Sequence, residues 1–143
     1  MEISNYCNMF LSGTTANVAF ARSTVAAFCA PLEPTLEEIN DVKTAVSEAV
    51  NNCIVHGYQG TSGEVHLEIL LFEAMAQVTV QDYGCGFDNI DEAMQPFFTS
   101  KPQDERSGMG FTLMQAFMDE VEVRSEVGKG TTVVMRKRFG QNA

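Results

Sequence analysis

The chain has 143 residues, of which 45% are hydrophobic and 20% are charged, and its formal net charge is −10. This length predicts a single domain with one hydrophobic core, and the negative charge argues against direct binding of nucleic acid, whose phosphates would be repelled. No apolar run approaches the roughly 20 residues of a membrane span, and the first residues lack a secretory signal pattern, so we expect a cytoplasmic protein.

Two helices are predicted in the first half of the chain. Residues 14–30 repeat apolar side chains at helical spacing and end before a proline. A second apolar repeat runs from Leu36 to about His56 and ends before a glycine. Thr35, with Glu38 three residues later, matches a capping box, so we expect this helix to begin directly after Thr35.

The middle of the chain predicts a β-hairpin followed by a long loop. Residues 64–72 and 75–82 alternate apolar and polar side chains, which is typical of strands, and a short turn separates them. Glycine, proline and polar residues dominate from 83 to 107, with a short helical possibility around 90–94. Loops of this length are usually functional or disordered.

The last third of the chain predicts one more helix and two strands. The helix covers residues 110–118, and the strands cover 121–127 and 131–139 on either side of a GKG turn. Helices therefore come first and a mixed sheet with one inserted helix follows, which indicates the α+β class.

The cysteines do not form a metal-binding pattern. They stand at positions 7, 29, 53 and 85, with no CxxC pair and only two histidines elsewhere. A zinc site therefore has little support, and we expect reduced, buried thiols.

Glu48 and Asn52 are the first candidates for chemistry. They lie four residues apart on the predicted second helix, so their side chains point to the same side and can reach one site. Such a pair is also common on the solvated edge of a surface helix. The pair alone does not decide between the two interpretations.

Two glycine-rich segments are the next candidates. Asp82 ends a predicted strand and opens the sequence DYGCG, in which Gly84 and Gly86 permit close approach of the backbone to a ligand. A carboxylate there can accept a hydrogen bond from an amino group. In RSGMGF, Gly108 and Gly110 open the third predicted helix, whose N-terminal N–H groups suit a phosphate chain. Either segment by itself could also be an ordinary turn.

The order of these motifs is more informative than any one of them. ExxxN on a helix, DxGxG after a strand, GxG at the start of a helix and GTT on a returning strand follow one another along the chain. In this order they resemble the Bergerat-fold ATP-binding domain of the GHKL superfamily, which gyrase, Hsp90-type chaperones, histidine kinases and MutL share. The Walker-type phosphate motif does not occur in the sequence, in agreement with this different phosphate site.

Four longer segments narrow the resemblance. Residues 20–28, 41–58, 96–102 and 105–123 closely resemble the anti-sigma F factor family of endospore-forming bacteria, also called stage II sporulation protein AB. The likeness covers nearly the whole chain and is weakest at its two ends. It implies a two-layer α+β sandwich, with a mixed, mainly antiparallel sheet packed on helices, as one ATP-binding serine kinase domain over residues 1–143.

The resemblance also implies an activity and its partners. Members of the family bind a sporulation sigma factor in an ATP-dependent way and phosphorylate a serine of an anti-anti-sigma factor, with Mg²⁺ as the metal and ADP as a product. The family is dimeric, which implies a homodimer that pairs the N-terminal region and the sheet. The alternative is a nucleotide-gated module that sequesters the sigma factor with little kinase activity. A kinase of an unrelated partner-switching system is a third possibility.

The resemblance implies roles for individual residues. Asn52 would hold Mg²⁺ through its side-chain oxygen, and Glu48 would accept the proton of the serine hydroxyl as general base. Asp82 would read the adenine amino group. Gly84 and Gly86 would let the base lie against the backbone.

The remaining residues are expected to support the adenine, to contact the phosphates or to bind the protein partners. Thr131 would support the adenine through its hydroxyl or a water molecule. Arg22 matches the family arginine on the first helix that contacts both protein partners, although an ordinary solvated residue is the alternative interpretation. Residues 97–110 correspond to an ATP lid, in which Arg106 is the candidate for the γ-phosphate. The lid residues expected to touch the phosphates or close over them are Thr99, Ser100, Lys101, Arg106, Ser107, Gly108, Met109 and Gly110.

Overall fold

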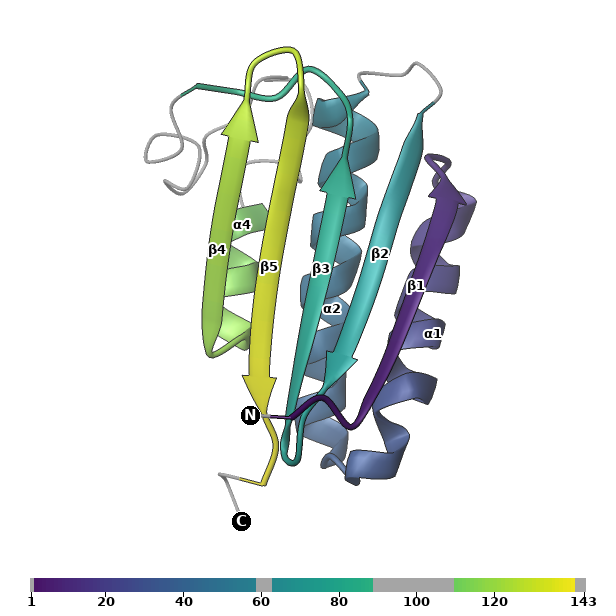
Figure 1. Cartoon of the computed structure of the whole chain (residues 1–143), viewed down its shortest axis with the longest axis vertical. Helices are drawn as coiled ribbons and strands as arrows, with labels where there is room; N and C mark the ends of the chain where they lie inside the picture. Colours follow the sequence, from purple (N-terminus) through teal and green to yellow (C-terminus); the bar gives the residue numbers. More distant parts are fainter. Residues whose placement is uncertain (1, 59–62, 89–109, 141–143) are drawn as a thin grey trace.

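The computed structural model describes residues 2–58, 63–88 and 110–140. Within them, five strands form one sheet and three α-helices cover one of its faces, in two layers (Figure 1). The predicted α+β class is confirmed. The order along the chain is β1 (Asn5–Ser12), α1 (Ala16–Cys29), α2 (Leu36–Asn52), β2 (Glu64–Leu71), β3 (Met75–Asp82), α4 (Gly110–Phe117), β4 (Glu120–Glu126) and β5 (Gly130–Arg138).

The sheet order is β1-β2-β3-β5-β4, and each neighbouring pair is antiparallel. The predicted hairpin joins β2 to β3, with Leu71 opposite Ala76, and β4 and β5 form a second hairpin around the predicted turn. The expected antiparallel character is confirmed, although the described pairs include no parallel one that would make the sheet mixed. β1 and β4 are the two edge strands of the described sheet.

The core lies between the sheet and the helices. Alternate residues of β2 point inward, and Val65, Leu67, Ile69 and Leu71 are buried while the intervening side chains are partly exposed. Burying one such side chain contributes about 1.5–3 kcal/mol. The inward-facing side chains recur every two residues along the strands and about every 3.6 residues along the helices, and both sets pack in one core. The helix α2 adds an apolar stripe made of Val42, Ala45, Val46, Ala49 and Val50.

Thr35 and Glu38 define the start of α2. Thr35 Oγ1 accepts the backbone N–H of Glu38 at 3.1 Å, and Glu38 Oε1 accepts the backbone N–H of Thr35 at 2.8 Å. The predicted capping box is confirmed. The second carboxylate oxygen of Glu38 accepts the backbone N–H of Gly140 at 2.8 Å. One buried carboxylate therefore joins the helix start to the segment after β5.

The end of the second helix differs from the prediction. The α-helix gives way to a π-helical turn at Cys53–Gly57, in which the N–H of Tyr58 bonds to the carbonyl oxygen of Cys53 at 2.9 Å. A π turn carries an extra residue, which apolar spacing alone does not reveal. The carbonyl oxygen of Gly57 accepts the backbone N–H of Cys85 at 2.9 Å, so the helix end is attached to the loop after β3.

Three further expectations concern the thiols, the loop and the membrane. Cys29 and Cys53 are buried free thiols, but Cys7 is half-buried and Cys85 is exposed, so the expectation of burial is wrong for these two. The possible helix at 90–94 lies outside the described residues. Among the helices of the described ranges, none is long and apolar enough to cross a membrane.

Candidate functional site

Asp82 is a buried carboxylate at the end of β3, with 3% of the residue exposed. Its Oδ1 accepts the backbone N–H of Gly84 at 2.9 Å and that of Thr131, from β5, at 3.2 Å. Burial raises the pKa of Asp82, and these hydrogen bonds lower it without cancelling the rise. The carboxylate is thus oriented by backbone N–H groups from two separate segments.

Gly84 and Gly86 stand where neighbouring backbone comes too close for a side chain. A Cβ atom on Gly84 would overlap the carbonyl oxygen of Gly57, and one on Gly86 would overlap that of Glu126. Gly86 also has a φ of +64°, which favours glycine. The glycines of DYGCG therefore let the loop pack against the π turn and the β4–β5 hairpin. Their contact with a base stays a prediction.

Thr131 belongs to a small hydroxyl network that the sequence did not indicate. Its Oγ1 lies 2.8 Å from Oγ of Ser125, and Ser125 Oγ accepts the backbone N–H of Phe87 at 2.8 Å. Ser125 therefore links the start of β5 to the loop after β3. The available signal was the hairpin register, which pairs Ser125 with Thr131 once the turn is located.

Asn52 lies at the end of α2, against the start of α4. A Cβ atom on Gly110 would lie 2.9 Å from Nδ2 and 3.1 Å from Oδ1 of Asn52, so the glycine lets the two helices meet at this amide. Glu48 is half-buried one turn earlier on α2. The positive end of the α4 dipole therefore adjoins the residue predicted to hold a metal ion.

The elements that carry these residues end on the same side of the molecule. Figure 1 shows the end of α2, the end of β3 and the β4–β5 turn at the upper end, and α4 has its N-terminal end toward the same side. Arg22 is exposed on α1 and is not part of this group. The predicted site residues that the fold brings to this end are Glu48, Asn52, Asp82, Gly84, Gly86, Gly110 and Thr131. The predicted site residues outside the described part of the chain are Thr99, Ser100, Lys101, Arg106, Ser107, Gly108 and Met109.

Comparisons with known proteins decide the family. Residues 11–137 match the histidine kinase-like ATPase domain family. The anti-sigma F factors of Bacillus thuringiensis (strain Al Hakam) and Bacillus anthracis (strain A0248) are each 54% identical to this chain over 134 residues, which make up 93% of this chain and 92% of theirs. The chain belongs to the anti-sigma F factor family.

Solved structures share the fold of this anti-sigma F factor at low sequence identity. The RsbU and RsbW domains of a Mycobacterium tuberculosis protein match with a TM-score of 0.67 and 18% identity, over 95% of this chain and 32% of that chain. The mycobacterial sensor histidine kinase MprB matches with a TM-score of 0.58 and 14% identity, over 93% of this chain and 98% of that chain. The protein is thus an ATP-binding anti-sigma factor of sporulation on a kinase-like fold, with ATP-dependent, kinase-type activity.

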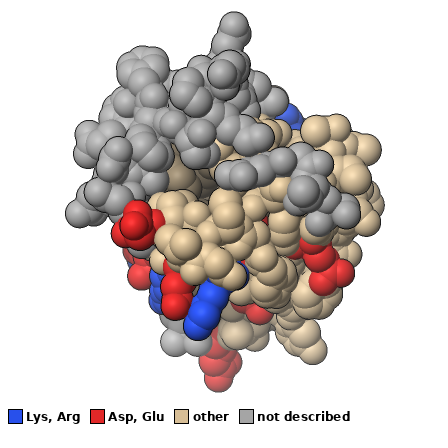
Figure 2. Space-filling view, turned by 90° about the horizontal axis from the view of Figure 1, so that it is seen from above, with Lys and Arg blue, Asp and Glu red and all other residues tan. Residues whose placement is uncertain are grey.

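Figure 2 looks down on the site end of this anti-sigma F factor. The described surface that faces the viewer is mostly uncharged, and acidic side chains and a few basic ones lie toward its margin. The phosphates of ATP are themselves negative, so they need cationic or N–H donors. The predicted cations for this purpose, Lys101 and Arg106, lie outside the described residues.

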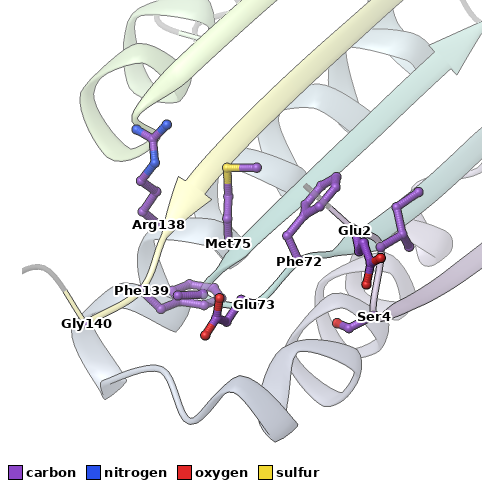
Figure 3. Close-up of a pocket in the computed structure, with 10 residues that line it drawn as sticks. Glu2, Ser4, Phe72, Glu73, Met75, Arg138, Phe139 and Gly140 are labelled. Atoms are coloured by element: carbon purple, nitrogen blue, oxygen red, sulfur yellow. The ribbon is translucent and has the colours of Figure 1, made fainter.

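A surface groove lies at the opposite end of the anti-sigma F factor. Its lining includes Phe72, Met75 and Phe139, together with Glu73 and Arg138 (Figure 3). The strand β3 runs from this groove to Asp82, and its length of about 23 Å separates the two places. The groove contains none of the predicted site residues and is therefore separate from the candidate site.

Proposed function

We propose that this anti-sigma factor sequesters a sporulation sigma factor in an ATP-dependent way and phosphorylates a serine of an anti-anti-sigma factor. One observation carries the proposal. A buried, oriented carboxylate on β3 and a carboxylate with an amide on α2 are present at the same end of the molecule. This arrangement suits recognition of a nucleotide base next to a place for phosphoryl transfer. The protein would act in the cytoplasm, where bacterial sigma factors work.

The surroundings of Asp82 fit an adenine. A buried carboxylate that Gly84 and Thr131 already orient can accept an N–H of the amino group and disfavour a base that lacks this group. Gly84 and Gly86 would present backbone rather than side chains to the ring. Thr131 would support the ring through its hydroxyl, which is hydrogen-bonded to Ser125.

Asn52 would hold a magnesium ion through Oδ1. Mg²⁺ usually takes one or two protein ligands and keeps its other positions for phosphate oxygens and water, so a single amide oxygen suits it. The positive N-terminal end of α4, which lies beside Asn52, would suit the phosphates rather than the ion. The bound ion would neutralise phosphate charge. The lid at residues 97–110, with Arg106 as the candidate for the γ-phosphate, would supply further phosphate contacts.

Glu48 would act as the general base. It lies one turn before Asn52 on the same side of α2, so a serine hydroxyl directed at the phosphates would come within its reach. In the transfer, the serine oxygen bonds to the γ-phosphorus, the bond to ADP breaks, and the hydroxyl proton passes to Glu48. Positioning and charge neutralisation supply most of the rate in such reactions, so the base contributes about 10²–10⁴-fold.

Two exposed surfaces are suited to the protein contacts of this proposal. Arg22 is exposed on α1, where its charge is accessible to a sigma factor or an anti-anti-sigma factor. On the edge strand β1, Tyr6 and Phe10 are 68% and 58% exposed, and exposed aromatic side chains are enriched in protein interfaces. Arg22 would therefore bind the partners, and β1 with its sheet would form a homodimer interface.

The test follows label from [γ-³²P]ATP, with Mg²⁺, into the serine of the anti-anti-sigma factor. Glu48→Gln should lower this transfer by about 100-fold or more while ATP binding and sigma binding remain. Glu37→Gln is the matched control, because Glu37 is exposed at the other end of the same helix.

The outcomes separate the roles. Full transfer by Glu48→Gln would remove Glu48 from the role of base. If the unmodified protein binds the sigma factor in an ATP-dependent way but transfers no phosphate, the nucleotide-gated module describes it better.

A further inference from the structure

Asp82, Thr131 and Ser125 form a row of polar residues across three neighbouring strands. β3, β5 and β4 lie side by side in the sheet (Figure 1). Ser125 pairs with Thr131 across β4 and β5, and the backbone N–H of Thr131 bonds to Asp82 Oδ1 at 3.2 Å. Asp82 and Thr131 each lie two residues from a core valine, Val80 and Val133, so both side chains belong to the helix-covered face. Thr131 thus stands between the carboxylate and Ser125.

The Ser125 hydroxyl has three hydrogen-bond partners. Its Oγ accepts the backbone N–H of Phe87 at 2.8 Å, and it lies 3.2 Å from the carbonyl oxygen of Gly130 and 2.8 Å from Oγ1 of Thr131. A hydroxyl has one proton and two acceptor positions. The N–H of Phe87 can only donate and the carbonyl of Gly130 can only accept, so the single proton of Ser125 points to Gly130. All three contacts are hydrogen bonds only when Thr131 donates to Ser125.

This arrangement decides what the Thr131 hydroxyl offers to a ligand. Its proton is directed at Ser125, which leaves only acceptor positions on Oγ1. An ionised carboxylate on Asp82 is also only an acceptor. An amino group carries two N–H donors and can satisfy both side chains, whereas a base with a carbonyl oxygen at the same position finds no donor on either.

We propose that Ser125 is a positioning residue for adenine recognition, because it accepts the hydrogen bond of the Thr131 hydroxyl and so makes Thr131 an acceptor for the amino group of the base, directly or through one water molecule. The inference rests on the proposed nucleotide site. Ser125 acts through Thr131 and not on the base itself. It therefore favours a nucleotide whose base carries this amino group.

The bond to Phe87 gives Ser125 a second, structural role in holding the loop after β3. This loop carries Gly84 and Gly86, which the proposed function places against the ring. Loosening it would weaken every purine nucleotide alike, whatever group the ring carries at position 6. A changed preference between two bases is therefore the signature of the inferred role.

The experiment compares ATP with purine riboside triphosphate, which lacks the 6-amino group, and calorimetry gives both dissociation constants for each variant. Ser125→Ala frees the Thr131 hydroxyl to turn its proton elsewhere, so the ratio of the two constants should shift against ATP by about 3- to 10-fold. Ser125→Thr keeps the hydroxyl and should retain the preference for ATP. Ser125→Cys offers only a weak acceptor and should lose part of this preference, so it tests the inference if Ser125→Ala does not fold.

Thr79→Val is the matched control. Thr79 is a half-buried residue of β3 that pairs with Val134 instead of Thr131, and it alternates with the buried residues of its strand. Its side chain therefore points to the sheet face away from the helices. Removing this hydroxyl should leave the ratio of the two dissociation constants unchanged, even where it lowers the melting temperature.

Thr131→Val tests the route from Ser125 to the base. This change removes the hydroxyl through which Ser125 is inferred to act. Adding Ser125→Ala to Thr131→Val should therefore not shift the ratio further, and the two changes should be strongly non-additive.

Three results would overturn the inference. Equal weakening of ATP and the analogue by Ser125→Ala would mean that Ser125 only holds the loop, and unchanged affinity for both would mean no role in recognition. A further shift of the ratio in the double variant would mean that Ser125 does not act through Thr131.

Asp82→Asn separates failure of the inference from failure of the proposed site. If Asp82→Asn leaves the affinity for ATP unchanged, the proposed adenine site itself is wrong. If Asp82→Asn weakens ATP and Ser125→Ala leaves the ratio unchanged, the inference alone is wrong.

Discussion

Glu38 and Asp82 are both buried carboxylates, but they lie at opposite ends of the molecule. Glu38 is 2% exposed beside the start of α2, and Asp82 is 3% exposed at the end of β3. Burial raises the pKa of Glu38, but hydrogen bonds from the backbone of Thr35 and Gly140 outweigh it, so the pKa is lowered. The pKa of Asp82 is raised, because burial outweighs its hydrogen bonds.

This difference distinguishes a carboxylate that serves the fold from one that serves a ligand. Both oxygens of Glu38 are bonded within the fold, and the positive charge of Lys137 also lowers its pKa, so its ionised form stabilises the folded state. Ionised Asp82 destabilises the folded state instead. A charged group kept at such a position is a candidate for function.

In this comparison of the two carboxylates, the largest expected effect is that of Asp82 on nucleotide binding. Asp82→Asn replaces one acceptor oxygen by an NH₂ group, so ATP and ADP should bind about 5- to 150-fold more weakly, which corresponds to about 1–3 kcal/mol. The free energy of unfolding should not fall, because burial disfavours the charge that is removed. Calorimetry and urea unfolding measure the two quantities. A variant with lower stability and unchanged affinity would reverse the roles of the two carboxylates.

A smaller effect, on the free energy of unfolding alone, is expected at Glu38, at the other end of the molecule. Glu38→Gln leaves one of two backbone N–H groups facing an NH₂ group, so the free energy of unfolding should fall by about 1–2 kcal/mol. The affinity for ATP should stay the same. Glu37→Gln serves as control, because Glu37 is exposed in the same first turn and is not part of the capping box. A loss of ATP affinity in Glu38→Gln would contradict the separation of the two ends.

The smallest effect is the pH dependence of these stability differences, which should have opposite signs. The stabilisation by Glu38 is present above its ordinary pKa of 4.5 and is lost as the pH falls through the lowered pKa of the folded state. The destabilisation by Asp82 is present above its raised folded-state pKa and disappears as the pH falls to its ordinary value of 3.8. Urea unfolding of both variants from pH 7 to about pH 3 measures this. If acid moves the two stability differences from the unmodified protein in the same direction, the assigned pKa directions are wrong.

The predicted site residues and the observed contacts illustrate what could be read in advance. The order of the motifs and the family resemblance indicated Asp82, Asn52 and Glu48. They did not indicate Ser125, because it belongs to no motif. Ser125 acts on the predicted Thr131 through a contact between two strands.

The sequence by itself determined the helices, the hairpins and the capping box at Thr35, because each depends on neighbours within a few residues. It also determined the family, since proteins that are closely related in sequence keep the same motifs in the same order. Only the tertiary structure decided that a π turn places Gly57 against Asp82, and that Glu38 reaches Gly140. These contacts join positions far apart in the chain, and their geometry follows from strand order, register and helix packing rather than from local spacing.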